Sequence, residues 1–349
     1  MQIKKVVVIV MIQIRDLTLK ELEDTIIQMG EQKFRAKQIY KWVNLGIENF
    51  EEMTDLPKKL REELKEVFLI KNMDIVDKQE SSDGTVKYLL KLLDGNLIEA
   101  VLMRYSYGNS ICISTQAGCS MGCIFCASTI GGKLRNLTAG EMLGEVLTII
   151  KDQNIKLSNI VLMGTGEPLD NFDNVIKFLQ IVNSKEGLNI GMRHITISTC
   201  GLVPEIKRLA DLKLQITLAI SLHAPNDEIR KKIMPIAYRY SFEDLLEACR
   251  YYIEKTNRRI TFEYALIKGI NDSIEHAEEL AKRLKGLLCH VNIIPVNPVS
   301  ERNFERPEKI KIEVFKNILD KNGINVTIRR ELGTEIEAAC GQLRRRYIT

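Results

Sequence analysis

Six short apolar segments, each followed by residues with helical spacing, occupy the chain from residue 110 onward. Each segment is rich in branched residues and short enough to be a buried strand. They lie at residues 111–114, 160–163, 195–198, 214–221, 260–266 and 291–296. Because strands that alternate with helices form parallel sheets, the sequence predicts an α/β protein built on six strand–helix units.

Capping residues mark where three of the intervening helices begin. Thr138 and Ser241 each stand three residues before an acid, as in a capping box, and Ser273 precedes a periodic segment at 274–284. A hydroxyl in that position accepts a hydrogen bond from an otherwise unpaired backbone N–H. The sequence therefore predicts helix starts at these three places.

Polar and glycine-rich residues follow the ends of the predicted strands. The residues at these ends are Gly166, Glu167, Ser198, Ser221, Leu222, His223 and Asn297. Each one alone is more often a cap or turn residue than a ligand contact. Since the carboxyl ends of parallel strands meet at one edge of a sheet, their recurrence predicts a ligand-binding rim.

Three cysteines follow the first strand with C-x3-C-x2-C spacing, at Cys119, Cys123 and Cys126. Three thiolates can hold three irons of a 4Fe-4S cluster and leave the fourth iron open to a substrate. A structural zinc ion needs a fourth ligand, which the histidines, all far downstream, could supply only at long range. Packing as three small apolar groups would not explain the glycines around them. We therefore predict a 4Fe-4S cluster.

The segment before the repeats has a different character. Residues 18–68 keep helical spacing and predict a small helical domain. Its basic and aromatic stretch at 33–42 suits either an RNA contact or an amphipathic helix with buried aromatics, and the segment alone favours the second.

A hairpin is predicted next, because residues 86–92 and 97–103 read as two strands that flank a turn. Glu99, in the second strand, is expected to face outward.

Composition narrows the protein class. The 349 residues are 45% hydrophobic and 28% charged, which suits one large domain and a small one. The net charge of +4 is modest, so nucleic-acid binding would depend on local arginine clusters such as 344–346. The low cysteine density predicts a reducing, cytoplasmic environment, and the apolar stretch at 6–12 is too short for a membrane span, so we expect no membrane association.

The C-terminal Ala-Ala-Cys-Gly-Gln-Leu, centred on Cys340, is specific when combined with other motifs. The others are Cys-Ile-Ser-Thr-Gln before the three cysteines, Phe-Cys-Ala-Ser-Thr, Arg-Asn-Leu, Gly-Glu-Pro-Leu, Ile-Ser-Thr-Cys-Gly, Ser-Leu-His-Ala and Pro-Val-Asn-Pro. Together they resemble the dual-specificity RNA adenine C2-methyltransferases of the radical S-adenosylmethionine (SAM) superfamily over nearly the whole chain. Thr165, where we expect methionine, and the residues before Met11 are the two departures.

The resemblance implies a fold and its cofactors. The fold is a partial (β/α)6 barrel with one 4Fe-4S cluster and an open iron, at which one of two SAM molecules used per turnover is cleaved. The seven rim residues named above would bind SAM. The implied domains are an RNA-binding helical domain at 1–70, a hairpin linker at 71–104, a radical SAM core at 105–333 and a C-terminal segment at 334–349.

The resemblance also implies roles for three catalytic residues. Cys340 would accept a methyl group from SAM, Cys112 would form a transient disulfide with Cys340, and Glu99 would accept a proton. The implied substrates are adenosine 2503 of 23S rRNA and adenosine 37 of tRNAs, with an electron donor of the flavodoxin or ferredoxin type and a monomeric enzyme. Cys200, Cys249 and Cys289 match no such role, and we expect them to be packing residues.

Two alternatives remain open at this point. A related C8-methyltransferase of the same rRNA adenosine shares the cluster and both catalytic cysteines, although Pro168 and Arg330 look more like the C2 enzymes. A non-catalytic iron–sulfur RNA-binding protein is the alternative of another class. A fourth cysteine near the other three would have favoured it.

Overall fold

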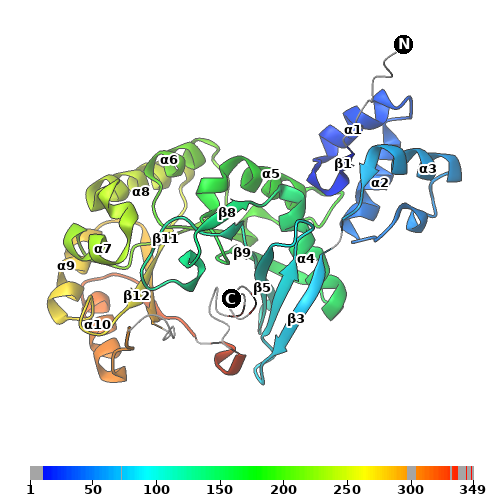
Figure 1. Cartoon of the computed structure of the whole chain (residues 1–349). Coiled ribbons are helices and arrows are strands. Elements are labelled where there is room, and N and C mark those ends of the chain that lie inside the picture. The colour runs from blue at the N-terminus through cyan, green and yellow to red at the C-terminus, as the bar shows by residue number, and fades with distance from the viewer. Residues whose placement is uncertain are drawn as a thin grey trace, which may run out of the picture.

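The computed structural model describes residues 11–71, 73–296, 304–330 and 332–336, together with residues 343 and 347. At its centre is a ten-stranded sheet in the order β14-β13-β12-β11-β10-β9-β6-β5-β4-β3, which curves around an interior (Figure 1). The parallel strands are β6 (Gly108–Cys112), β9 (Leu157–Leu162), β10 (Ile195–Thr199), β11 (Thr217–Ser221), β12 (Ile260–Leu266), β13 (Cys289–Pro295) and β14 (Val326–Ile328). The sheet continues antiparallel through β5 (Leu97–Tyr105), β4 (Val86–Lys91) and β3 (Asp74–Glu80).

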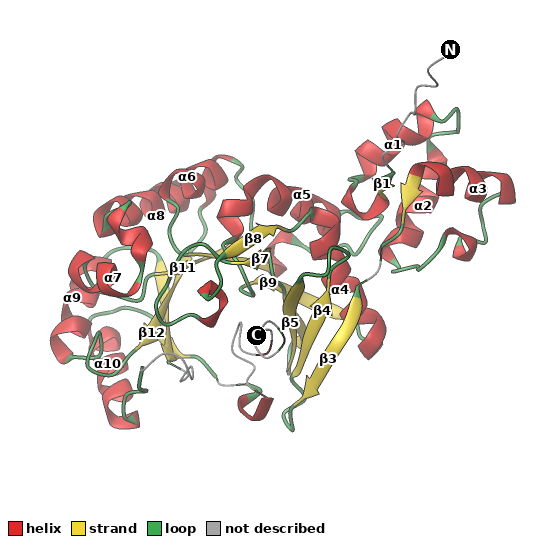
Figure 2. Ribbon diagram, viewed as in Figure 1, coloured by secondary structure: helices red, strands yellow, loops and turns green. Residues whose placement is uncertain are grey.

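Helices pack on the outer face of the parallel strands (Figure 2). These helices are α4 (Ala139–Gln153), α5 (Phe172–Asn183), α6 (Val203–Asp211), α7 (Asp227–Ile233), α8 (Phe242–Thr256), α9 (Ile274–Leu284) and α10 (Lys309–Lys321). Short 3-10 turns connect several elements: η3 (Ala127–Thr129), η4 (Pro168–Asn171), η5 (Met192–His194), η6 (Pro235–Tyr238) and η7 (Thr334–Ile336). The α/β fold and the partial parallel barrel are therefore as predicted.

The positions of the strands agree with the predicted bounds in some places and differ in others. The predicted strand at 260–266 has the predicted bounds, and the hairpin is formed by β4 and β5. Two strands of the sheet were missed: β14, with three residues, is too short for a recognisable pattern, and β3 carries mostly polar residues. The hairpin region is consequently part of the ten-stranded sheet.

The three predicted helix starts are present. The hydroxyls of Thr138, Ser241 and Ser273 accept hydrogen bonds from the backbone N–H groups three residues later, at 3.1, 3.1 and 3.2 Å. Each such cap contributes about 1 kcal/mol to helix stability. These caps fix where α4, α8 and α9 begin behind the sheet.

The N-terminal residues form a separate helical unit of α1 (Leu19–Gln28), α2 (Phe34–Asn44) and α3 (Lys58–Val67), with β1 (Ile12–Gln13), β2 (Phe68–Leu69), η1 (Ile14–Asp16) and η2 (Phe50–Glu52) (Figure 1). Asp16 Oδ1 accepts a hydrogen bond from Gly140 N–H at 2.6 Å, which ties this unit to the start of α4. In α2 the side chain of Tyr40 is buried as expected, whereas Phe34 is 54% exposed. The aromatics of α2 are thus divided between core and surface.

The two faces of the β4–β5–β6 region have different surroundings. One face contributes apolar residues such as Tyr88 and Ile98 to the main hydrophobic core. The other carries Val101, Met103 and Cys112, which pack with Val161 and Met163 of the neighbouring parallel strand region. Among the helices of the described part of the chain, none is long and apolar enough to cross a lipid bilayer.

Candidate active site

The three motif cysteines lie on one loop, between the paired strands β7 (Gln116–Gly118) and β8 (Lys133–Asn136). Local hydrogen bonds shape the loop: Cys126 N–H donates to Cys123 O at 3.1 Å, and the single hydroxyl proton of Thr129 is shared between Cys126 O at 2.9 Å and Cys123 O at 3.2 Å. Ile124 N–H donates to Ile233 O at the end of α7, at 3.0 Å. The loop is therefore fixed both internally and against the barrel.

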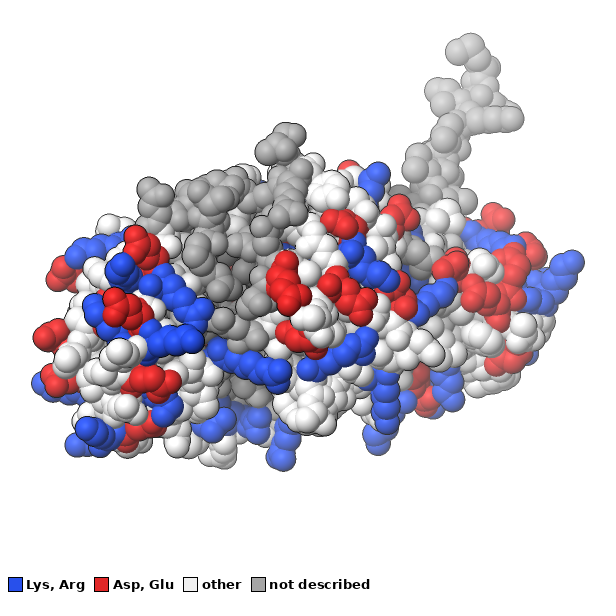
Figure 3. All heavy atoms as spheres, turned by 90° about the horizontal axis from the view of Figure 1, so that it is seen from below, with Lys and Arg blue, Asp and Glu red and all other residues white. Residues whose placement is uncertain are grey.

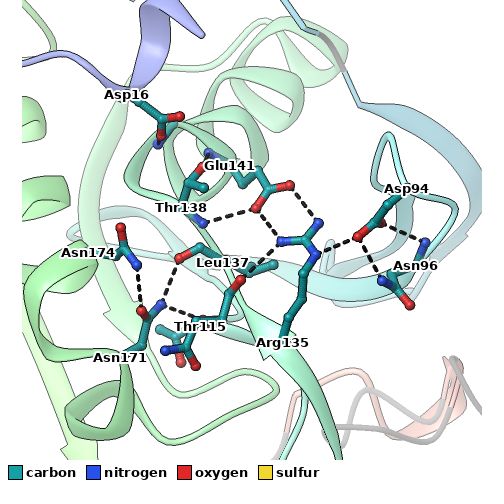
Figure 4. Close-up of polar contacts among 12 residues, drawn as sticks. Asp16, Asp94, Asn96, Thr115, Arg135, Leu137, Thr138, Glu141, Asn171 and Asn174 are labelled. Atoms are coloured by element: carbon teal, nitrogen blue, oxygen red, sulfur yellow. Dashed lines mark hydrogen bonds and ion pairs between the residues drawn. The ribbon is translucent and has the colours of Figure 1, made fainter. Parts of the chain in front are cut away.

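A polar network holds the base of this loop (Figure 4). The guanidinium of Arg135, on β8, makes two hydrogen bonds to the carboxylate of Glu141 at 2.7 and 2.8 Å and also binds Asp94. Asn171 Nδ2 donates to the carbonyls of Thr115 and Leu137, at 2.9 and 2.8 Å. Bidentate arginine–carboxylate contacts are among the most directional in proteins, so the strands that carry the loop are well positioned.

The chemistry of the cysteines suits an iron–sulfur cluster. Cys119 and Cys123 are buried and Cys126 is half-buried. Burial, reinforced by the charge of Cys126, raises the pKa of Cys119 to about 12 and that of Cys123 above its usual range. Such thiols become thiolates only when a cation neutralises them, and the irons of a cluster would do so.

Among the described residues, no group of three or more His, Cys, Asp and Glu side chains is arranged to hold a single metal ion. Each thiolate of a 4Fe-4S cluster binds a different iron, so cluster ligands need not converge on one point. The three thiols on this loop fit that donor set. Cys119, Cys123 and Cys126 are the residues that would hold the cluster.

The loop after β9 packs closely at Gly166 against β7, the strand that leads into the cysteine loop. Its φ of +113° and the position of Gln116, whose Cβ would lie 2.7 Å from an added Cβ, leave room only for glycine. The buried carboxylate of Glu167 accepts hydrogen bonds from Cys200 N–H at 2.8 Å and Leu169 N–H at 3.0 Å. Glu167 therefore joins the ends of β9 and β10, two neighbouring strands of the rim.

His223, two residues after the end of β11, is held in one protonation state. Its Nδ1 accepts a hydrogen bond from Ala265 N–H at 2.8 Å, and its ring packs edge-on against Phe125 of the cysteine loop, with centroids 4.9 Å apart. Burial, together with the charge of Arg230, lowers the pKa of His223 to about 3. The imidazole is thus neutral at pH 7 with its proton on Nε2, which makes Nε2 a hydrogen-bond donor.

The other predicted rim residues occupy the expected strand ends. Ser198 lies on β10 and Ser221 ends β11, and both are half-buried. Leu222 is fully buried in the main hydrophobic core, and its carbonyl accepts a hydrogen bond from Arg230 Nε at 3.3 Å. Asn297 lies outside the described residues.

Glu99 and Cys112 share the interior face of β5 and β6. The strand register pairs Val101 with Cys112, so Glu99, two residues before Val101, lies on the same face as the thiol. Glu99 is 3% exposed, and the prediction that it faces outward is wrong. The reason is that the sheet curves, so the polar face of the hairpin becomes an interior wall rather than a solvent face.

Comparison with known proteins agrees with this arrangement. A family profile described as the radical SAM superfamily matches residues 113–284, and one described as the ribosomal RNA large subunit methyltransferase N-terminal domain matches residues 12–70. A Clostridium novyi protein named "Probable dual-specificity RNA methyltransferase RlmN" is 59% identical over 96% of this chain and 98% of its own length. A protein of the same name from Alkaliphilus oremlandii is 58% identical over 97% of this chain and 98% of its own. The chain belongs to the RlmN family.

A solved structure supports the RlmN fold. The crystal structure of a radical SAM methyltransferase from Sphaerobacter thermophilus has a TM-score of 0.91 and 45% sequence identity, and the match covers 95% of this chain and 98% of that one. The RlmN chain described here is therefore a radical SAM enzyme with a SAM and 4Fe-4S requirement, as its motifs predicted.

Two charged interior residues of this RlmN chain do not stand out in the sequence. Lys87 on β4 is fully buried and forms an ion pair with Glu99, with Nζ 3.2 Å from Oε2. Glu263 on β12 is 4% exposed and accepts a hydrogen bond from Asn292 Nδ2 at 3.1 Å. The signal that could have identified both is a charged residue flanked on each side by apolar residues within a strand, as in Val86-Lys87-Tyr88 and Phe262-Glu263-Tyr264. Cys340 lies outside the described residues.

Proposed function

We propose that this RNA methyltransferase methylates C2 of adenosine 2503 in 23S rRNA and of adenosine 37 in tRNAs. The observation that carries the proposal is the wall formed by β5 and β6, where Glu99 and Cys112 share the interior face of the barrel. A base and a thiol on one wall, near a loop with three cysteines, match the roles that the family motifs imply. The RlmN relatives carry dual-specificity RNA methyltransferase in their names, which supports the two substrates.

The difficulty of the reaction explains why two thiols are needed. C2 of adenine is an electrophilic carbon, so it cannot attack the methyl group of SAM directly. By its motif, Cys340 would take the methyl group by ordinary displacement and so carry it on sulfur. When bound, the cluster would supply one electron to a second SAM, whose cleavage activates the S-methyl group by removal of a hydrogen atom.

Cys112 and Glu99 would complete the transfer. After the methylene radical on the sulfur of Cys340 has added to C2, Glu99 would take up the proton that leaves C2, and the unpaired electron of the adduct would return to the cluster, when bound, in place of the electron given to SAM. The sulfur of Cys112 would then attack the sulfur of Cys340, so that an S–S bond forms and the S–C bond breaks. The electron pair of the broken bond stays on carbon, which takes up a proton and becomes the methyl group.

The rim residues would orient SAM in distinct ways. We assign the SAM amine to Glu167 or to the neighbouring backbone at Gly166; each carboxylate oxygen of Glu167 already accepts one backbone N–H, which fixes the carboxylate on the rim and leaves it further acceptor sites. The Nε2–H of His223 would donate to the ligand. Ser198, Ser221 and Asn297 would supply the remaining polar contacts.

RNA binding would combine the helical domain with local cationic sites. On the face shown in Figure 3, lysines and arginines lie among acidic side chains along the length of the molecule, so attraction by bulk charge is limited. We further propose a monomeric cytoplasmic enzyme that is reduced by a flavodoxin- or ferredoxin-type donor.

The test is anaerobic reaction with RNA and SAM, followed by analysis of the released nucleosides. We expect 2-methyladenosine at the two positions named above. 8-Methyladenosine would instead assign the C8 reaction, and unmodified RNA from a protein with a full cluster would contradict the enzyme assignment.

A further inference from the structure

Lys87 is a fully buried lysine that the proposed reaction does not use. It lies on β4, and its Nζ is 3.2 Å from Oε2 of Glu99, which is itself 3% exposed. Removing an ammonium and a carboxylate from water costs several kcal/mol per ion, and apolar residues of the same size often serve stability as well. A buried pair at this position therefore calls for an explanation other than packing.

The strand register places Lys87 on the interior wall. In β4 and β5, Lys87 pairs with Val101 and Leu89 pairs with Glu99, so the lysine and the glutamate lie diagonally across the two strands on one face. Val101 in turn pairs with Cys112 on β6. The ammonium, the carboxylate and the thiol thus belong to three consecutive strands of one wall.

Glu99 is held at its backbone as well as at its side chain. Its carbonyl accepts a hydrogen bond from Ser114 Oγ at 2.7 Å, and that hydroxyl oxygen accepts one from Thr165 N–H at 3.0 Å. Ser114 N–H donates to the buried Glu145 at 2.9 Å. The backbone contacts fix the Cα of Glu99, and the contact with Lys87 constrains where its carboxylate points.

We propose that Lys87 is a positioning residue for Glu99: its ammonium orients the carboxylate on the wall that also carries Cys112, so that an oxygen is directed at the proton leaving C2. This inference rests on the proposed role of Glu99 as proton acceptor. Lys87 itself touches neither substrate nor SAM in this assignment. Its loss should therefore arrest the reaction at the same step as the loss of Glu99.

The experiment compares Lys87→Met, Lys87→Arg and Glu99→Gln with the control Lys91→Met. Lys91 lies four residues further along β4 on the same face but is exposed, so it controls for loss of a lysine from this strand. All variants are reconstituted with iron, and SAM cleavage, methylation of the protein and formation of methylated RNA are measured separately. General bases typically contribute roughly 10²–10⁴-fold to rate, and we expect a loss in that range for Glu99→Gln.

Lys87→Met should lose about 10-fold or more of the RNA methylation rate, because a misdirected base forfeits part of the roughly 10²–10⁴-fold that a general base contributes, while protein methylation and SAM cleavage stay normal. RNA attached covalently to the protein should accumulate in Lys87→Met, as in Glu99→Gln. Lys87→Arg should recover part of the rate, and Lys91→Met should behave like the wild type. Normal RNA turnover in Lys87→Met would overturn the proposal.

A double variant separates positioning from a structural role and remains usable if Lys87→Met alone folds poorly. Removing both partners relieves the unpaired buried charge, so Lys87→Met/Glu99→Gln should fold. If Lys87 acts through Glu99, the double variant should be no slower than Glu99→Gln alone. A further loss in the double variant would refute the inference, whereas full activity in Glu99→Gln would refute the proposed function of Glu99 instead.

Discussion

Replacing Gly166 by alanine tests how the rim is built. The φ of +113° is strained for any residue with a Cβ, which costs at least about 1–2 kcal/mol by analogy with left-handed backbone. The new Cβ would also lie 2.7 Å from Gln116 Cβ and 2.8 Å from its backbone N, and overpacking of this kind typically costs about 1–3 kcal/mol. The sum predicts a destabilisation of about 2–5 kcal/mol for Gly166→Ala.

Gly269→Ala provides the matched control. Gly269 also has a positive φ, of +72°, but nothing lies within 4 Å of an added Cβ, so only the strain of about 1–2 kcal/mol applies. Denaturant unfolding of both variants without cofactor, with SAM binding measured after reconstitution, gives the comparison. Gly166→Ala should unfold at lower denaturant than Gly269→Ala and should bind SAM more weakly. Equal midpoints and equal SAM affinity would refute the close-contact argument.

Three further predictions concern the cluster, the rim and RNA. On anaerobic reconstitution the wild type should take up about four irons per chain, and replacing Cys119, Cys123 or Cys126 by serine should abolish this uptake. The control Cys249→Ser should still take up iron. Uptake of zinc without iron would contradict the cluster assignment. His223 stays neutral in the folded state down to about pH 3, whereas in the unfolded state it binds a proton below about pH 6.5, so acid destabilises the fold. Between pH 7.5 and 5.5 the free energy of unfolding of the wild type should fall by about 1 kcal/mol more than that of His223→Gln. Equal losses would contradict the neutral imidazole. The exposed ring of Phe34, with the Arg35 guanidinium 4.8 Å from its centroid, is placed to stack on an RNA base. Phe34→Ala should therefore weaken RNA binding about 5- to 100-fold in a filter-binding assay, and the control Leu45→Ala, at another exposed apolar residue, should not. Equal affinities of the two variants would show that Phe34 does not contact RNA.

The sequence predicted the fold and the rim because both depend on local patterns. Alternation of apolar strands and helices indicates a parallel sheet, and the carboxyl-end rule brings Glu167 and His223 to one edge without knowledge of the packing. The spacing of Cys119, Cys123 and Cys126 was equally local, and the structure places all three on one loop.

The contacts that depend on the curvature of the sheet could not be predicted. Lys87 and Glu99 interrupt apolar strands, and in a flat hairpin such residues face solvent. Only the closing of the sheet around its interior buries both, at 0% and 3% exposure, and turns them into an ion pair. The tautomer of His223 likewise depends on Ala265 N–H, which β12 supplies from a distant part of the chain.

The most direct test of the two-thiol reaction is the fate of RNA in the Cys112→Ala variant. Without the Cys112 thiol the methylene bridge between Cys340 and C2 cannot be broken by disulfide formation. After reaction with SAM and RNA, a denaturing gel should show RNA attached to the protein, and mass spectrometry after nuclease digestion should place the adduct on Cys340. Cys340→Ala should show neither methylated protein nor adduct. Free methylated RNA released at the normal rate by Cys112→Ala would contradict the reaction proposed for this enzyme.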